Sequence, residues 1–263
     1  METLPAKAGC PALQMEGVTV VSMAQPRIVV AEDVNWTVNV GDYWLVAGLQ
    51  GSGKSDFLML AGGLMAPESG SYQFLGKPMP IFEDARLRDR LRLGFVFDGG
   101  QLLSRLTVRE NIALPLRYHQ QRTEAEIEGT IDRLLEALDL GAWADHLPSG
   151  LARNWQKRAG LARALALQPE VLLVDNPLGG LDLRHTNWWV DFLGQLSRGH
   201  ALLEGRAVTL VITAADLRPW RGHARQFALL NERRLRVLGA WAELEAAGGE
   251  ALRELLTEET PSG

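Results

Sequence analysis

Short runs of apolar residues alternate along the chain with stretches whose apolar positions recur every three or four residues. Residues 43–47, 93–97, 171–174 and 208–213 are compact apolar runs, typical of strands buried on both faces of a sheet. Residues 34–40 alternate between apolar and polar, which predicts a half-buried strand. Because these strands are separated by helical stretches, we expect an α/β fold in which helices cover a parallel sheet.

The middle of the chain is more purely helical. One apolar helical stripe is formed by Ile127, Ile131, Leu134, Leu135 and Leu138. Upstream, Thr107 and Glu110 have the spacing of a capping box at the start of a helix. We therefore expect an α-helical subdomain at about residues 98–151, inserted into one domain of residues 12–250. Residues 1–11 and 251–263 are expected to be loose tails.

Composition and charge exclude several classes of protein. The 263 residues are 46% hydrophobic and 22% charged, which are ordinary globular values. The net charge of −5 argues against a nucleic-acid partner held by bulk charge. Cys10 is the only cysteine, so no intrachain disulfide can form and a reducing compartment is the default. With no apolar run of about 18 residues and no signal-peptide pattern, we expect a soluble, cytoplasmic protein.

The strongest motif lies between the predicted strand 43–47 and a helical run. Residues 48–55 read Gly-Leu-Gln-Gly-Ser-Gly-Lys-Ser, which matches the phosphate-binding loop G-x-x-x-x-G-K-[ST] completely. Glycines let backbone N–H groups point at phosphate oxygens, while the lysine reaches the β/γ-phosphates and the serine hydroxyl ligates Mg²⁺. The predicted nucleotide-binding residues are Gly48, Leu49, Gln50, Gly51, Ser52, Gly53, Lys54, Ser55 and Asp56.

A carboxylate at the end of another strand completes the expected metal site. Asp175 directly follows the apolar run 171–174. In phosphate-loop proteins an aspartate at such a strand end holds Mg²⁺ beside the loop. We predict that Ser55 and Asp175 bind the Mg²⁺ of a bound Mg-ATP. A strand-end aspartate that only caps a turn is the alternative.

With these motifs the chain resembles the ATPase subunits of ATP-binding cassette (ABC) transporters over about residues 13–244. Besides the phosphate loop, the resemblance rests on residues 106–116, residues 156–165 and the stretch Gly180-Leu181-Asp182, which is similar to the family's D-loop. Residues 102–116 most resemble Mla-type subunits, which traffic lipids in bacteria.

The resemblance implies a fold and a mode of action. The fold would be a RecA-like P-loop NTPase core with a mostly parallel sheet, an antiparallel β part near the N-terminus and an inserted helical subdomain. Cassettes of this family work as dimers that sandwich two nucleotides and bind an integral-membrane permease. The chain would then be peripheral on the cytosolic face of the membrane, as a homodimer or a heterodimer, and bind no nucleic acid.

Two catalytic positions of the family are occupied by inert residues. Asn176 stands where the family has the glutamate that polarises the attacking water, and losing a positioned general base costs about 10²–10⁴-fold in rate. Ala214 stands where the family has a histidine that contacts the γ-phosphate. The adenine-stacking aromatic also has no counterpart, since residues 18–30 contain neither Tyr nor Phe.

Two further departures affect contacts to the γ-phosphate. Asp98 replaces the glutamine that the resemblance places after Phe97. The family's Leu-Ser-Gly-Gly-Gln signature, which acts on the neighbour's nucleotide, reads Leu-Ala-Arg-Asn-Trp at residues 151–155. Its altered positions are Ala152, Arg153 and Asn154.

Three interpretations follow. The first is a nucleotide-binding subunit of a transporter whose hydrolysis is weak or lost. The second is an active ATPase in which Asp98 supplies the missing carboxylate and Arg153 acts on the neighbour's γ-phosphate like an arginine finger. The third is a soluble ABC protein that acts in translation or repair. The presence of a single cassette, without a second one in tandem, argues against this third interpretation. Simpler roles exist for both residues: Arg153 can be a surface residue, and Asp98 can cap its loop.

Overall fold

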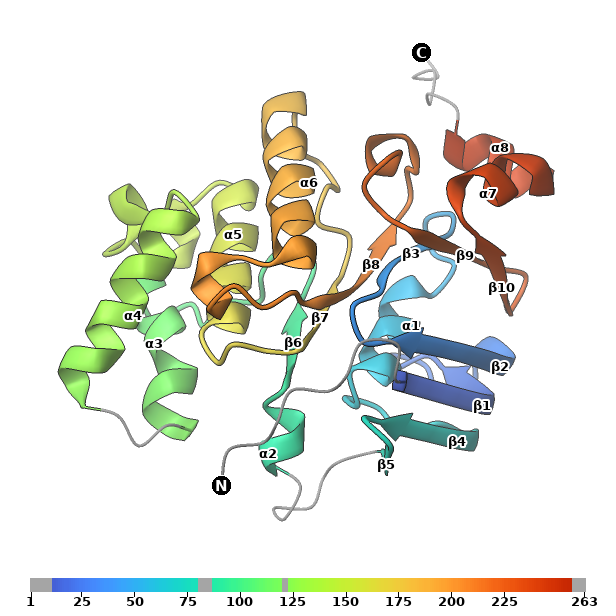
Figure 1. Ribbon diagram of the computed structural model, residues 1–263, viewed down its shortest axis with the longest axis horizontal. Helices are drawn as coiled ribbons and strands as arrows, with labels where there is room; N and C mark the ends of the chain where they lie inside the picture. Colours follow the sequence, from blue (N-terminus) through green and yellow to red (C-terminus); the bar gives the residue numbers. More distant parts are fainter. Residues whose placement is uncertain (1–10, 80–86, 120–122, 257–263) are drawn as a thin grey trace.

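The computed structural model describes residues 11–79, 87–119 and 123–256. Its strands form two sheets (Figure 1). The main sheet has the order β10-β9-β3-β8-β7-β6, and its five strands from β9 to β6 are parallel. The six strands of the main sheet are β3 (Tyr43–Ala47), β6 (Leu93–Val96), β7 (Val171–Val174), β8 (Thr209–Ala214), β9 (Gln226–Asn231) and β10 (Arg234–Gly239), of which β10 is antiparallel to its neighbour β9.

The second sheet is antiparallel and contains the N-terminal strands. Its order is β2-β1-β4-β5, with strands β1 (Pro11–Val21), β2 (Val29–Asn39), β4 (Ser69–Phe74) and β5 (Lys77–Pro78). The mostly parallel core and the antiparallel part near the N-terminus, both expected from the sequence, are thus confirmed.

Strand β3 shows why its sequence is continuously apolar. All five of its residues are buried. Tyr43, Leu45 and Ala47 belong to a core shared with the α3–α6 side of the sheet, whereas Trp44 and Val46 belong to a core shared with α1 and the antiparallel sheet. A strand covered on both faces has no polar side, so period-two alternation is lost.

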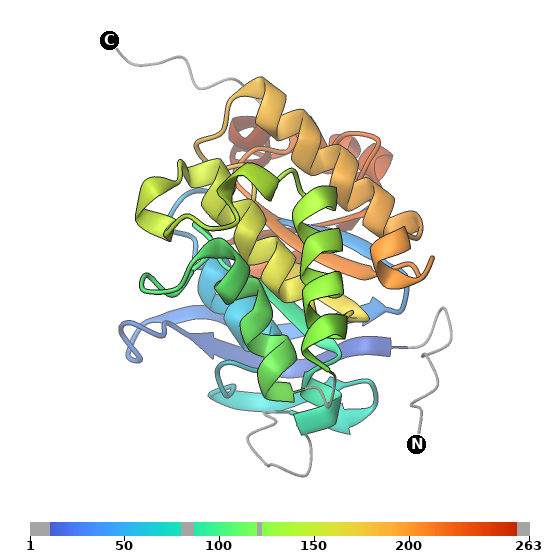
Figure 2. The same ribbon diagram turned by 90° about the vertical axis from the view of Figure 1, so that its left-hand side faces the viewer.

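The helices divide between these two cores. Helices α3 to α6 gather on one side of the molecule, the side that faces the viewer in Figure 2. Among the described residues, no helix combines the length and the apolar character needed to cross a bilayer. The helices are α1 (Lys54–Ala61), α2 (Leu87–Arg90), α3 (Val108–His119), α4 (Glu124–Ala137), α5 (Arg153–Leu165), α6 (Leu183–Arg198), α7 (Trp241–Ala247) and α8 (Glu250–Leu256).

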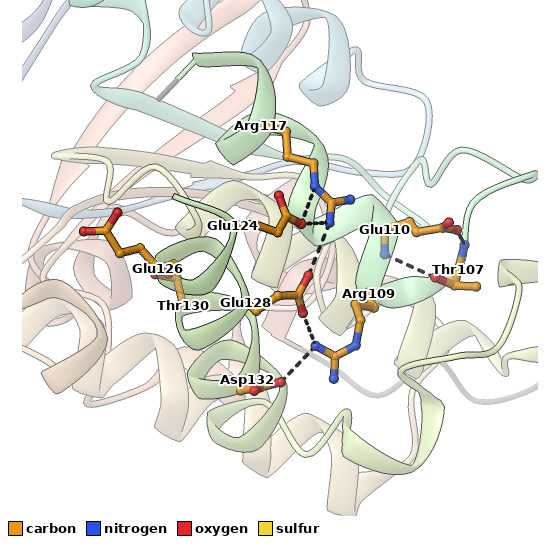
Figure 3. A network of polar contacts seen from close by, with 9 residues as sticks. All are labelled: Thr107, Arg109, Glu110, Arg117, Glu124, Glu126, Glu128, Thr130 and Asp132. Carbon is orange, nitrogen blue, oxygen red and sulfur yellow. Dashed lines mark hydrogen bonds and ion pairs between the residues drawn. The ribbon is translucent and has the colours of Figure 1, made fainter. Parts of the chain in front are cut away.

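The helical part of residues 98–151 contains α3 and α4, and α5 follows it directly and packs against α3. The capping box at the start of α3 is confirmed: the Thr107 N–H donates to Glu110 (2.7 Å) and the Glu110 N–H donates to the Thr107 hydroxyl (3.2 Å). Ion pairs from Arg109 and Arg117 to carboxylates of α4 join the two helices (Figure 3). These groups are partly exposed, so each pair contributes at most about 1 kcal/mol.

The end of the chain differs from expectation. Residues 251–256, expected as part of a loose tail, belong to α8, and Leu252 and Leu255 are buried. The tail expectation was wrong for this segment because these two leucines pack into the core shared with α3–α6. At the other end, Pro11 begins β1, and the remaining residues of both expected tails (1–10 and 257–263) lie outside the described residues.

Candidate functional site

The loop between β3 and α1 has the backbone that its glycines allow. Gly51 and Gly53 have φ of 79° and 86°, a left-handed conformation that residues with side chains rarely adopt. At Gly53 there is also no space, since a Cβ there would lie 2.2 Å from Cγ1 of Val30. The loop therefore needs glycine at this position for two independent reasons, and the bare backbone leaves its N–H groups accessible to a ligand.

Helix α1 begins without a side-chain cap and with a lysine as its first residue. Its N-cap is Gly53, which offers no side-chain oxygen to the first-turn N–H groups. The Lys54 ammonium folds back over the loop and donates to the carbonyl oxygens of Gly48 (2.6 Å) and Leu49 (2.8 Å). Burial lowers the pKa of Lys54, while the negative charge of Asp175 acts in the opposite direction. A helix N-terminus with a neighbouring cation favours a bound anion.

Asp175 is held in place by β8. The hydroxyl of Thr213 donates to Oδ1 of Asp175 (2.6 Å), and the same hydroxyl accepts the N–H of Asn176 (2.9 Å). Asp175 is only 7% exposed and lines the same cavity as Lys54 and Ser55. Parallel strands end at one edge of a sheet, and this places the β7 carboxylate beside the phosphate loop.

The lining of this cavity suits a Mg²⁺-bound triphosphate. The cavity has a volume of about 1160 Å³. Its oxygen donors include the Ser55 hydroxyl and the Asp175 carboxylate, and oxygen is the ligand that Mg²⁺ prefers. The described residues contain no cluster of three His, Cys, Asp or Glu residues that could hold a metal alone. Mg²⁺ typically takes one or two carboxylates and completes its shell with water and phosphate oxygens, so this donor set fits.

The structure brings most of the predicted site residues together. The cavity is lined by Leu49, Gln50, Gly51, Gly53, Lys54, Ser55, Asp56, Asp98, Arg153, Asp175, Asn176, Gly179, Gly180, Ala215, Asp216, Arg218 and Leu255. Gly48 and Ser52 belong to the loop without lining the cavity. The Ser52 hydroxyl is buried and has no hydrogen-bond partner within the described part of the chain.

Ala214 does not line the cavity. It is the last residue of β8 and 5% exposed, and its carbonyl accepts the N–H of Gly48 at 3.2 Å. The next residue, Ala215, lines the cavity instead. The backbone of Ala214 thus fixes the start of the phosphate loop, while its methyl group offers nothing to a phosphate.

Asp98 is the centre of a cluster of polar groups. The Arg153 guanidinium donates to both carboxylate oxygens (2.9 and 3.0 Å), the Lys157 ammonium lies at 3.1 Å and the Asn176 amide at 3.3 Å. Burial raises the pKa of Asp98, but the hydrogen bonds and charges of Arg153 and Lys157 outweigh burial and hold it below its usual value. A carboxylate stabilised in its ionised form is a weak base.

Lys157 is a member of this cluster that the sequence did not single out. It is 1% exposed and donates to the carbonyl oxygens of Asn176 (2.7 Å), Pro177 (3.1 Å) and Gly179 (3.1 Å). The sequence carries one signal for this residue, a lysine one helical turn after Arg153; its burial follows only from the packing of α5.

Asn154 is buried between α5 and α6 and is turned away from the cavity lining. Its amide nitrogen lies 3.1 Å from Nδ1 of His185, and its carbonyl oxygen accepts the indole N–H of Trp189 (3.1 Å). Asn154 is 4% exposed, whereas Ala152 is exposed just before α5. Of the three altered signature positions, only Arg153 lines the cavity.

The fold and this loop define a P-loop NTPase with an inserted helical subdomain. A family model described as "ABC transporter" matches residues 31–179, and the chain belongs to this family. Among solved structures, the cassette MJ0796 bound to ADP and Pi is similar with a TM-score of 0.75 and 26% identity over 87% of this chain and 100% of the other. A second MJ0796 structure, described as a bacterial ABC transporter cassette, has a TM-score of 0.74 and 27% identity over 85% and 96%.

The cbiO1 protein of Clostridium perfringens, described as part of the ABC transporter complex cbiONQ, shares the fold. Its TM-score is 0.75 at 22% identity, and the match covers 90% of this chain and 91% of the other. The MJ0796 structures were both described as dimeric. The expectation of an ABC-type ATP-binding cassette is confirmed.

Proposed function

We propose that the chain is the ATP-binding subunit of an ABC-type membrane transporter and that it binds Mg-ATP with hydrolysis weak or lost. Gly48–Ser55 and Asp56 form the nucleotide site, with Lys54 placed for the β/γ-phosphates. Ser55 and Asp175 would hold the Mg²⁺, which when bound neutralises charge on phosphate oxygens. The observation that carries the proposal is one cavity in which an intact phosphate loop and Asp175 face Asn176, an amide that cannot accept a proton.

The contacts of Asp98 speak against it as the replacement base. The two cations beside it stabilise the ionised carboxylate, and its oxygens already accept hydrogen bonds from Arg153, Lys157 and Asn176. A general base must accept a proton at its operating pH, and its efficiency falls as its pKa drops below that pH. If Asp98 were nevertheless the base, Asp98→Asn would abolish the remaining hydrolysis.

The wider assembly is also part of the proposal. The subunit would dimerise with itself or with a second cassette and bind an integral-membrane permease at the cytosolic face of the membrane. Nucleotide binding would gate closure of the dimer. The resemblance of residues 102–116 to lipid-trafficking cassettes makes a lipid the first cargo to test, while ribosome or DNA association in place of a permease would support the soluble alternative.

Two measurements on the purified protein test the nucleotide site. Calorimetry with MgATP should show binding that weakens about 10- to 100-fold in Lys54→Ala, since a hydrogen bond to a charged group contributes about 1.5–3 kcal/mol. Lys77→Ala, which removes an exposed lysine of β5, is the control and should bind normally. Phosphate release should stay well below about 1 s⁻¹, the low end for ordinary enzymes. An absence of binding at millimolar MgATP, or turnover above that rate, would refute the proposal.

A further inference from the structure

Arg153 lies in the nucleotide cavity of its own chain. It is the first residue of α5, and its side chain is 56% exposed and lines the cavity together with Lys54 and Ser55. Its guanidinium makes two hydrogen bonds to Asp98, at 2.9 and 3.0 Å. A residue that acted only on a neighbouring chain, or only faced solvent, would not need an ion pair with Asp98 of its own chain. The Arg153–Asp98 ion pair therefore needs its own explanation.

The place of the ion pair within the cavity indicates which part of a bound nucleotide it would meet. Asp98 also lies 3.3 Å from the amide of Asn176, the residue that follows the Mg²⁺-site aspartate Asp175. Lys157, the third donor to Asp98, interacts electrostatically with Asp175 as well. The pair therefore lies next to Asn176, in a cavity that Lys54, Ser55 and Asp175 also line. If Asp175 helps to hold the Mg²⁺ of a bound nucleotide, the terminal phosphates would lie in this part of the cavity.

The donors around Asp98 have the composition of a phosphate site. A guanidinium, an ammonium and a side-chain amide converge on one carboxylate. Phosphate oxygens are recognised by the same charge-assisted hydrogen bonds. Here one guanidinium nitrogen, Nη2 of Arg153, donates to both oxygens of Asp98. The other cation of the cavity wall beyond the loop, Arg218, bonds Asp216 two residues away through both prongs.

We propose that Arg153 distinguishes a nucleoside triphosphate from a diphosphate in its own chain's site, exchanging its Asp98 partner for the terminal phosphate. This proposal rests on the proposed function, because it requires that the cavity binds nucleotide. While the third phosphate is absent, the guanidinium of Arg153 is hydrogen-bonded to Asp98. The negative charge of Asp98 disfavours binding of a triphosphate more than binding of a diphosphate, so Asp98 limits the size of the preference for the triphosphate.

The test compares MgATP with MgADP by calorimetry at protein concentrations where light scattering finds a monomer. Arg153→Ala should lower the preference for ATP over ADP about tenfold, equivalent to about 1.4 kcal/mol, with ADP affinity changed less than about twofold. The ATP preference of Arg153→Lys should lie between those of the unmodified protein and Arg153→Ala, because an ammonium keeps the charge but lacks the planar set of five donors of a guanidinium. Asp98→Asn should raise the preference. Arg236→Ala, the same charge change on β10 outside the cavity lining, should leave it unaltered.

A mixing experiment separates action within the chain from action across a dimer. Lys54→Ala chains supply an intact Arg153 but bind nucleotide poorly, and Arg153→Ala chains supply an intact loop. Recovery of the ATP preference in an equimolar mixture would show that Arg153 acts on its partner's nucleotide and would overturn the proposal, whereas no recovery supports it. An unchanged preference in Arg153→Ala with both nucleotides still bound would overturn this inference alone. An unmodified protein that binds neither nucleotide would overturn the proposed function itself.

Discussion

Lys157 should be the costliest single side chain to remove near the cavity. Its ammonium donates to the carbonyls of Asn176, Pro177 and Gly179 at 2.7–3.1 Å and lies 3.1 Å from Asp98, while the side chain is 1% exposed. Lys157→Met keeps the length and the apolar stem but removes every one of these donors. The three carbonyls belong to the segment that follows β7, so the loss also loosens the loop that carries Asn176.

The expected magnitude follows from opposing contributions. Breaking a buried charged pair by removing one partner costs about 3–5 kcal/mol. Burial lowers the pKa of Lys157 and the charge of Asp98 raises it, so burying the ammonium is itself unfavourable and methionine avoids this cost. Asp98 also keeps Arg153 as a partner in the variant. We therefore expect Lys157→Met to lower the free energy of unfolding by about 3 kcal/mol. This is a large part of the total for a typical domain, which is about 5–15 kcal/mol.

Urea unfolding followed by far-UV circular dichroism measures this loss. The matched control is Lys77→Met, because the Lys77 side chain is 55% exposed and ion-pairs with Asp89 at the surface. Surface pairs contribute about 0–1 kcal/mol, so the control should stay within that range. If Lys157→Met is no more destabilising than the control, the four contacts of Lys157 do not stabilise this part of the fold.

Three further predictions concern the same region. Restoring the family's glycine with Asn154→Gly should lower the free energy of unfolding by about 1–3 kcal/mol, because the buried indole N–H of Trp189 loses its acceptor. Ala152→Ser should raise the free energy of unfolding by about 1 kcal/mol, because a serine can cap α5, which has no side-chain cap. Urea unfolding of both variants measures these two changes of opposite sign. Arg153 and Lys157 hold the pKa of Asp98 below its ordinary value of 3.8, so the stabilisation from the ionised carboxylate is present above that pH and is lost as the pH falls through the folded-state pKa. The stability difference between the unmodified protein and Asp98→Asn should therefore be constant above about pH 5 and shrink below pH 3.8, and an unchanged difference at pH 3 would contradict the ionised pair.

The parts of the fold that the sequence predicted depend on local rules. The strand at residues 43–47 and the glycines after it agree with β3 and its loop residue by residue, because a strand buried on both faces and a left-handed turn each restrict the residue types at their own positions. The capping box at Thr107 and Glu110 is local in the same way. Such features need no information about distant parts of the chain.

The features that the sequence did not predict depend on how distant segments dock. Asp98 and Arg153 are 55 residues apart and meet because α5 starts beside the loop after β6. The burial of Asn154 depends on α6, which brings His185 and Trp189 to it. The sequence does not predict α8, because this helix depends on the packing of Leu252 and Leu255 into a core formed by distant segments. In these cases the residue type alone did not say what the side chain would contact.

Three of the altered positions, Asp98, Arg153 and Asn176, form one unit with Lys157 and cannot be judged one at a time. The amide of Asn176 lies 3.3 Å from the Asp98 carboxylate, so a glutamate at position 176 would place two negative charges in contact. Like charges at this distance repel strongly unless one of them is protonated. Conversely, a neutral residue at position 98 would leave Lys157 buried without its carboxylate partner. The amide at 176, the carboxylate at 98 and the cations at 153 and 157 thus satisfy one another, and this cluster would resist return to the family pattern through any single substitution.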